Sequence, residues 1–153
     1  MSKKKSPRRR AWNPAIGAQT MRRVLMVKQV EQCREPLTPA EVAELSRAGW
    51  QAVAAIRAGN ATGEHTADLC VIAEICTELC SKGLGAEYTP QCAAASAVTE
   101  AIKAASDGRL TLTEGQLAAL EELLTVHDAM LQSGIYAGEY IQIIDALHRK
   151  CVA

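Results

Sequence analysis

Hydrophobic residues recur at intervals of three and four positions in six stretches of the chain, and polar residues fill the positions between them. This period is that of an α-helix with one buried side, whereas a half-buried strand would alternate at every second position. No stretch of the sequence alternates in that way over the length of a strand. The pattern predicts an all-α, single-domain bundle of five or six helices. The predicted helices cover about 14–35, 39–58, 64–81, 89–107, 113–133 and 137–151.

The clearest start signal is the stretch LTPAEVAEL, which begins at Leu37. Thr38 can cap a helix whose first turn holds Pro39, and Glu41 stands where it completes a capping box. The same helix should stop at Gly59-Asn60, because glycine accepts the left-handed conformation that ends many helices. Similar signals separate the other predicted helices, which supports the division into short helical segments.

Charge is distributed unevenly, although the formal net charge is zero. Six of the 17 basic residues lie within residues 1–10, so the rest of the chain has 11 basic against 17 acidic residues. The chain therefore divides into a disordered basic arm, residues 1–12, and an acidic helical domain, residues 13–153. The residues of the arm that could contact nucleic acid or an acidic partner are Lys3, Lys4, Lys5, Arg8, Arg9 and Arg10.

The composition is 48% hydrophobic but only 3% aromatic, and the chain has no Phe. The core must therefore consist of Ala, Leu, Ile, Val, Cys and Met, which allow helices to approach closely. No apolar run approaches the roughly 20 residues that span a bilayer. The basic N-terminus is also not followed by the apolar region of a signal peptide. We therefore expect a cytoplasmic protein that does not contact membranes and whose thiols stay reduced.

Three of the six cysteines occur in the stretch DLCVIAEICTELC. On a helical wheel Cys76 and Cys80 share the apolar face, whereas Cys70 falls on the other side with Glu74 and Glu78. The stretch has no Cys-x-x-Cys pair, which zinc sites commonly use. We therefore interpret these cysteines as small apolar core residues and expect neither a metal nor a cofactor.

Two further features could indicate an enzyme. Cys92 is the only thiol in the first turn of a predicted helix, where the helix end lowers the pKa of a thiol. His65, the pair His127-Asp128 and Asp145 are similar to the ligands of metal-dependent phosphohydrolases. However, His127 falls on the same helix face as several leucines, which favours a hydrogen-bonded core or interface histidine. We therefore expect no catalytic residue.

The segment 38–59 has some features of a helix-turn-helix module that reads DNA. Its turn is missing, because Arg47 occupies the expected glycine position and Gly49 comes two residues later. One continuous helix is favoured, and a DNA-binding regulator that uses this segment and the basic arm is the alternative function. The residues that match the module's cap, packing and stop positions are Thr38, Ala43, Val53, Ile56 and Gly59.

Four stretches, LTPAEVAEL, AAIRAGNATGEH, CSKGLGAEY and LLTVHDAMLQ, carry a resemblance that covers most of residues 37–150. Together they resemble small α-helical proteins of proteobacterial prophages and mobile elements. Those proteins have a basic N-terminus, a G-x-G-x-E turn and a HDxQL-like segment. The matching residues here are Gly83, Gly85, Glu87, His127, Asp128 and Leu131, with Met130 where glutamine is frequent.

The resemblance implies a genomic context and, with it, a class of function. Small phage proteins commonly act by docking on host machinery, and anti-CRISPR inhibitors are one such class. We therefore expect a non-enzymatic homodimer that binds a host protein, such as a defence or nucleic-acid machine, through charge complementarity. An acidic surface that is merely solvated is the alternative interpretation. The acidic residues expected to face the partner are Glu64, Asp68, Glu74, Glu78, Glu121 and Glu122.

Overall fold

The computed structural model describes residues 14–25, 28, 31–105 and 110–152. Within these ranges the chain forms six α-helices and no β-strand, which confirms the predicted fold class. The predicted basic arm, residues 1–12, lies outside the described residues. The helices are α1 (Pro14–Leu25), α2 (Pro39–Ala58), α3 (Gly63–Ser81), α4 (Thr89–Ala104), α5 (Glu114–Gln132) and α6 (Ala137–Val152), with short 3-10 turns η1 (Gln32–Arg34) and η2 (Ala86–Tyr88).

The predicted helix ends of α2 are confirmed in atomic detail. The Thr38 hydroxyl oxygen accepts a hydrogen bond from the Glu41 amide (3.3 Å), and the Glu41 carboxylate accepts one from the Thr38 amide (2.9 Å). Gly59 ends the helix at φ +75°. A second capping box, which sequence analysis missed, starts α3, where the His65 ring nitrogen Nδ1 accepts from the Thr62 amide (3.0 Å).

The first predicted helix is too long, because α1 ends at Leu25 and the next described helical turn is the separate η1. The reason lies in the extended segment that follows η1. Leu37 donates its amide to Ile135 (3.2 Å), and Ala137 donates to the carbonyl of Glu35 (3.0 Å). A helix that continued to Pro36 could not place these backbone groups beside the α5–α6 connection.

The helix α2 is uninterrupted over its 20 residues. The segment 38–59 therefore forms one continuous helix, as the sequence pattern favoured, and contains no helix-turn-helix. Gly49 does not form a turn. Instead it is buried inside the helix, where a Cβ atom would collide with Leu124 of α5 and lie 2.9 Å from Ile72 of α3.

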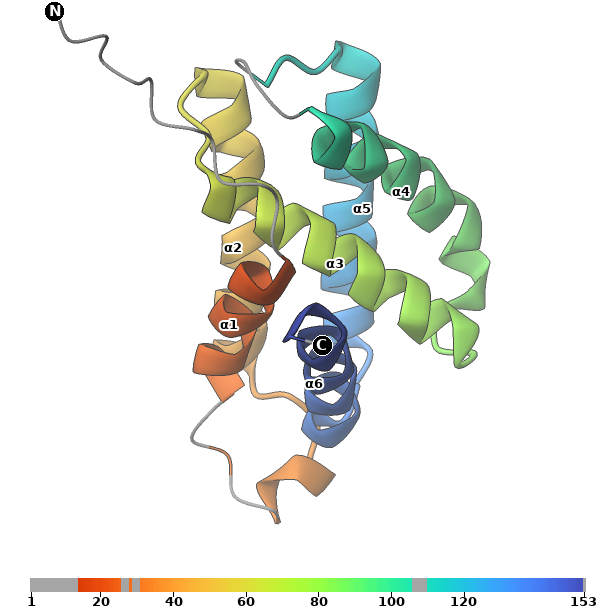
Figure 1. Ribbon diagram of the computed structural model, residues 1–153. Coiled ribbons are helices and arrows are strands. Elements are labelled where there is room, and N and C mark those ends of the chain that lie inside the picture. The colour runs from red at the N-terminus through yellow and green to blue at the C-terminus, as the bar shows by residue number, and fades with distance from the viewer. Residues whose placement is uncertain (1–13, 26–27, 29–30, 106–109, 153) are drawn as a thin grey trace, which may run out of the picture.

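The helix α3 occupies the middle of the bundle and contacts every other α-helix. Figure 1 shows it crossing the molecule obliquely, with α1, α2, α4, α5 and α6 arranged around it. Ten of its 19 residues are buried, so α3 is covered on nearly all sides rather than along one stripe. Its central run from Ala67 to Ala73 has no exposed position, and no side chain in that run is more than 5% exposed.

This arrangement corrects the wheel placement of Cys70. The sequence pattern placed that thiol on a polar side with Glu74 and Glu78, but Cys70 is fully buried. A helical wheel assumes one solvent-facing side, and the middle of α3 has none because helices cover it from opposite directions. Cys76 is also fully buried, as expected for a core residue, whereas Cys80 is partly exposed.

Two glycines permit the close packing around α3. A Cβ atom on Gly17 of α1 would lie 2.7 Å from the Ala67 carbonyl oxygen and 2.8 Å from a methyl group of Val71. Gly49 plays the same part in α2, as described above. Both glycines therefore carry a cost in helix propensity that the helix contacts offset.

We predict that Gly49→Ala destabilises the protein by about 1–3 kcal/mol, because the new methyl group overpacks the contact with Leu124 and Ile72. Gly115→Ala is the matched control, since a Cβ atom at this exposed helix position meets only the Thr113 hydroxyl at 3.9 Å. The control should be neutral or stabilising by up to about 1 kcal/mol. Urea unfolding followed by circular dichroism measures both. Equal or greater stability of Gly49→Ala would contradict the close approach.

Candidate interaction site

The C-terminal end of α3 and residues 142–150 of α6 border a cleft of about 470 Å³. Its apolar lining comes from Ile143, Ala146 and Leu147, which repeat along one side of α6. Ile143 and Leu147 also belong to the core and form an apolar floor of which little is exposed, so Ala146 supplies the exposed apolar position of the lining. The polar residues of the lining are Glu78, Lys82, Gln142, Arg149 and Lys150.

The rim of the cleft carries an excess of positive charge. Lys82 follows the last residue of α3, and Arg149 and Lys150 lie in the last turn of α6. The carboxyl ends of two helices favour cations here, because the helix dipole is negative at that end. Among the described residues, none of these three side chains takes part in an ion pair. Three cations and the single acid Glu78 therefore border an apolar floor.

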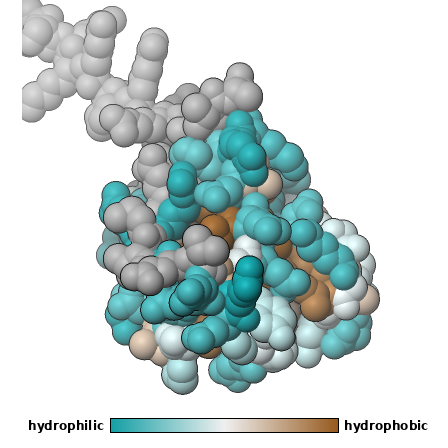
Figure 2. Space-filling view, turned by 90° about the horizontal axis from the view of Figure 1, so that it is seen from below, coloured by the Kyte–Doolittle hydropathy of each residue, from teal (hydrophilic) through white to brown (hydrophobic). Residues whose placement is uncertain are grey.

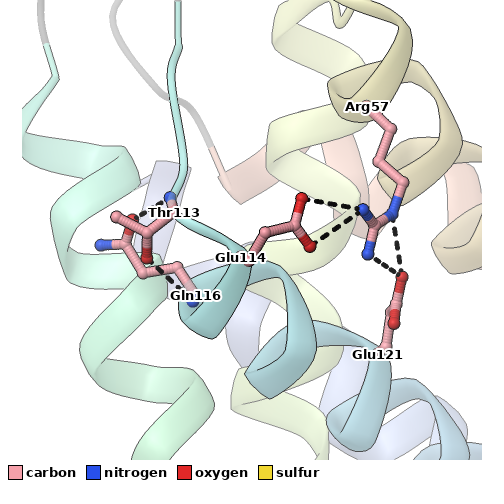
Figure 3. A network of polar contacts seen from close by, with 5 residues as sticks. All are labelled: Arg57, Thr113, Glu114, Gln116 and Glu121. Atoms are coloured by element: carbon pink, nitrogen blue, oxygen red, sulfur yellow. Dashed lines mark hydrogen bonds and ion pairs between the residues drawn. The ribbon is translucent and has the colours of Figure 1, made fainter.

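The acidic residues predicted to face a partner do not form one unpaired surface. Glu121 accepts hydrogen bonds from Arg57 at 2.6 and 3.0 Å, and Glu114 accepts from the same guanidinium, as Figure 3 shows. These contacts tie the end of α2 to the start of α5 and raise the pKa of Arg57. Glu74 is paired with Lys103 of α4 (3.1 Å).

The remaining predicted acids have different environments. Asp68 is only 5% exposed, so it cannot face a partner. Glu78 lines the cleft, and Glu64 and Glu122 are exposed on different helices. Asp68 is therefore excluded from the predicted acidic face, and partner binding by the other acids stays a prediction. The sequence pattern could not show that Arg57 of α2 pairs with Glu121 of α5, or that Lys103 of α4 pairs with Glu74 of α3.

Large hydrophobic side chains do not mark a second interaction surface. In the described part of the chain only Trp50, Leu84 and Tyr136 are exposed, and they belong to three separate segments. The Trp50 indole donates a hydrogen bond to Asp128 (3.0 Å). Figure 2 shows separate hydrophobic areas bordered by hydrophilic side chains on the face seen from below.

His127 is the core histidine that the leucine pattern indicated. It is fully buried, and its Nε2 lies 2.9 Å from the hydroxyl oxygen of the equally buried Tyr140. Burial lowers the pKa of His127 to about 4, so the ring is neutral at pH 7. The other two members of the phosphohydrolase-like set have separate partners. His65 caps α3, and Asp145 pairs with Arg22 (3.3 Å).

Neither a metal cluster nor a membrane span is present in the described ranges. No group of three or more His, Cys, Asp or Glu residues there is placed to hold a metal ion. None of the helices in those ranges is long and apolar enough to cross a membrane.

Comparisons with known proteins add no further information on this site. No family model matches the chain, and no curated protein or solved structure gives a significant match. The resemblance to prophage proteins therefore stays a prediction.

Asp68 is the most strongly perturbed carboxyl group among the described residues. Burial, together with the negative charge of Glu64, raises its pKa to about 7 against the lowering effect of a hydrogen bond from Thr20. Its oxygen Oδ1 has no hydrogen-bond partner in the described part of the chain. Asp68 is therefore protonated in the folded state at a pH where it is ionised in the unfolded chain.

We predict that Asp68→Asn stabilises the protein relative to wild type by about 1–3 kcal/mol more at pH 8 than at pH 5. The folded-state pKa of Asp68 is raised, so the contribution of its carboxyl to stability is present at low pH and is lost as the pH rises toward 7. Asn stays neutral throughout. Urea unfolding of the wild type and of the variant at both pH values measures the difference in their free energies of unfolding. Protonation of His127 affects both proteins alike, so it cancels in this difference.

Glu122→Gln is the matched control for this experiment, because it removes one exposed carboxylate. It should change stability by less than about 0.5 kcal/mol at either pH. A constant effect of Asp68→Asn across the pH range would contradict the raised pKa.

Proposed function

We propose that this protein is a non-enzymatic binding protein, and that the cleft between α3 and α6 docks an acidic, amphipathic segment of a partner protein. The observation that carries the proposal is the combination of an apolar floor with three cationic side chains that have no ion-pair partner among the described residues. The apolar floor offers area for a hydrophobic side chain, and the rim selects negative charge around it.

The size of the cleft fits a recognition site for a short segment rather than a complete interface. A volume of about 470 Å³ holds a few side chains, whereas a stable protein complex buries roughly 800 Å² on each partner. The cleft would therefore supply the central contact, and neighbouring surfaces would complete the interface. Because Lys82, Arg149 and Lys150 lie at the rim, they should act mainly on the association rate and on specificity.

The setting of this function follows the resemblance described above. We place the protein in the cytoplasm, and the partner class that the resemblance implies is a host defence or nucleic-acid machine. A homodimer is compatible with this proposal if the second copy leaves the cleft open. The proposal reverses the charge roles expected from the sequence, because it assigns recognition to basic rather than acidic residues.

A photoreactive amino acid tests where the partner docks. Placed at Ala146, which is exposed in the cleft, it should crosslink one partner protein in cells through an acidic segment. The same residue at the exposed Ala94 of α4 should not label that segment. A crosslink from Ala146 to a second copy of this chain would overturn the proposal, because the cleft would then be occupied by a homodimer contact.

Charge reversal then tests the chemistry with the purified pair. Lys82→Glu combined with Lys150→Glu should weaken binding at least about tenfold and slow association, because the rim would repel the acidic segment. Arg47→Glu combined with Arg23→Glu is the control, since both arginines are exposed outside the cleft. The control should change affinity by less than about threefold. Unchanged affinity of the rim variant, or retention that depends on nucleic acid, would contradict the proposal.

A further inference from the structure

Three cysteines that are distant in sequence meet at one end of the α3–α4 pair. Cys76 and Cys80 lie one turn apart on α3, and Cys92 lies in the first turn of α4. The sulfur atoms of Cys80 and Cys92 are 3.7 Å apart, and Cys76 also hydrogen-bonds to Cys92. Sequence analysis treated the α3 cysteines and Cys92 separately, because their juxtaposition depends on how α4 folds back.

The connection between α3 and α4 produces this juxtaposition. Gly83 and Gly85 have φ values of +80° and +86°, which other residues rarely adopt, and η2 follows directly. The Cys80 thiol donates a hydrogen bond to the carbonyl of Gly85 (3.2 Å). The turn therefore positions Cys80 while it delivers Cys92 to within contact distance.

We propose that Cys80 and Cys92 form an oxidisable thiol pair, which a small hydroperoxide converts to an intramolecular disulfide. The two sulfur atoms need to approach by about 1.7 Å to reach the bond length of a disulfide. Cys80 is partly exposed and opens the cluster to solvent, whereas Cys92 is 2% exposed. Only an oxidant close to the size of water should therefore reach the pair without unfolding of the surrounding helices.

The protonation of the cluster favours one sulfur as the nucleophile. Hydrogen bonds from Cys76 and Cys80 lower the pKa of Cys92 to about 7 despite its burial. Burial and the neighbouring Cys92 raise the pKa of Cys80 to about 11. Cys92 is therefore the thiol of this pair that loses its proton more readily, and Cys80 keeps its proton at neutral pH.

The reaction balances with hydrogen peroxide as the only added reactant. The Cys92 thiolate attacks one peroxide oxygen, the O–O bond breaks, and the departing hydroxide takes up a proton to become water. The Cys80 sulfur then attacks the sulfur of the Cys92 sulfenic acid, and its proton leaves with the sulfenic oxygen as a second water. Two thiols are oxidised to one disulfide, and one peroxide is reduced to two waters.

Peptide mapping without reductant tests the pair on the full-length protein. After treatment with hydrogen peroxide, the peptides that contain Cys80 and Cys92 should be linked, with the loss of two hydrogens. Cys92→Ser and Cys80→Ser should each abolish this link. Cys33→Ser, at a partly exposed thiol outside the cluster, should leave it unchanged. Intermolecular links through Cys33, or sulfinic acid at Cys92 without a link, would overturn the proposal.

A second measurement separates the chemical role of Cys76 from a structural one. Cys76→Ala removes a hydrogen bond to Cys92, so the pH profile of the rate at which peroxide oxidises Cys92 should shift upward by about one unit. Peroxide oxidation at pH 7 should then slow by about fivefold, while circular dichroism stays that of the wild type. An unshifted pH profile in a folded variant would show that Cys76 does not lower the pKa of Cys92. If the wild-type peptides also stayed unlinked, the proposal of an oxidisable thiol pair would be overturned.

Discussion

The burial of α3 on nearly all sides is the constraint on which the rest of the structure depends. A helix with one solvent-facing side can carry charges there at little cost, but the middle of α3 offers no such side. Its side chains must therefore be apolar, small or neutral between Ala67 and Ala73. The neighbouring helices must also approach closely, and Gly17 and Gly49 allow this at the cost of two weak helix positions.

The polar groups of the bundle follow from the same constraint. Asp68 belongs to the buried run and stays protonated to a pH near 7, and Glu74 at the edge of the run is neutralised by Lys103. Toward its C-terminal end α3 leaves the core, and there it borders both the α6 cleft and the thiol cluster with α4. The C-terminal end of α3 therefore lies beside both the charged rim of the cleft and the partly exposed thiol of Cys80.

The sequence predicted the helices well because their limits are local. Thr38, Glu41 and Gly59 act within a few residues of one another, and the structure places them as the pattern required. The wheel failed for Cys70, since no local pattern tells how many neighbours will cover a helix. The stop of α1 was also missed, because the segment after it pairs through its backbone with Ile135 and Ala137, about 100 positions further along the chain.

The candidate sites were harder to predict for a related physical reason. The basic rim combines Lys82 with Arg149 and Lys150 across two helices, and the thiol pair combines Cys80 with Cys92 across a glycine turn. Each set becomes recognisable only when the packing of α3 against α4 and α6 is known. The acids of α3 and α5, in contrast, were easy to see in the sequence. In the fold, however, Glu74 and Glu121 are paired with cations, Glu78 lines the cleft and Asp68 is buried.

Native-state hydrogen exchange tests the central position of α3 most directly. The account predicts that the backbone amides of residues 67–76 exchange only through global unfolding, with the highest protection of all described helices. Denaturant below the unfolding transition should lower their protection with the full slope of global unfolding. Exchange of these amides through local opening, at a free energy well below that of the α5 amides, would contradict a bundle built around α3.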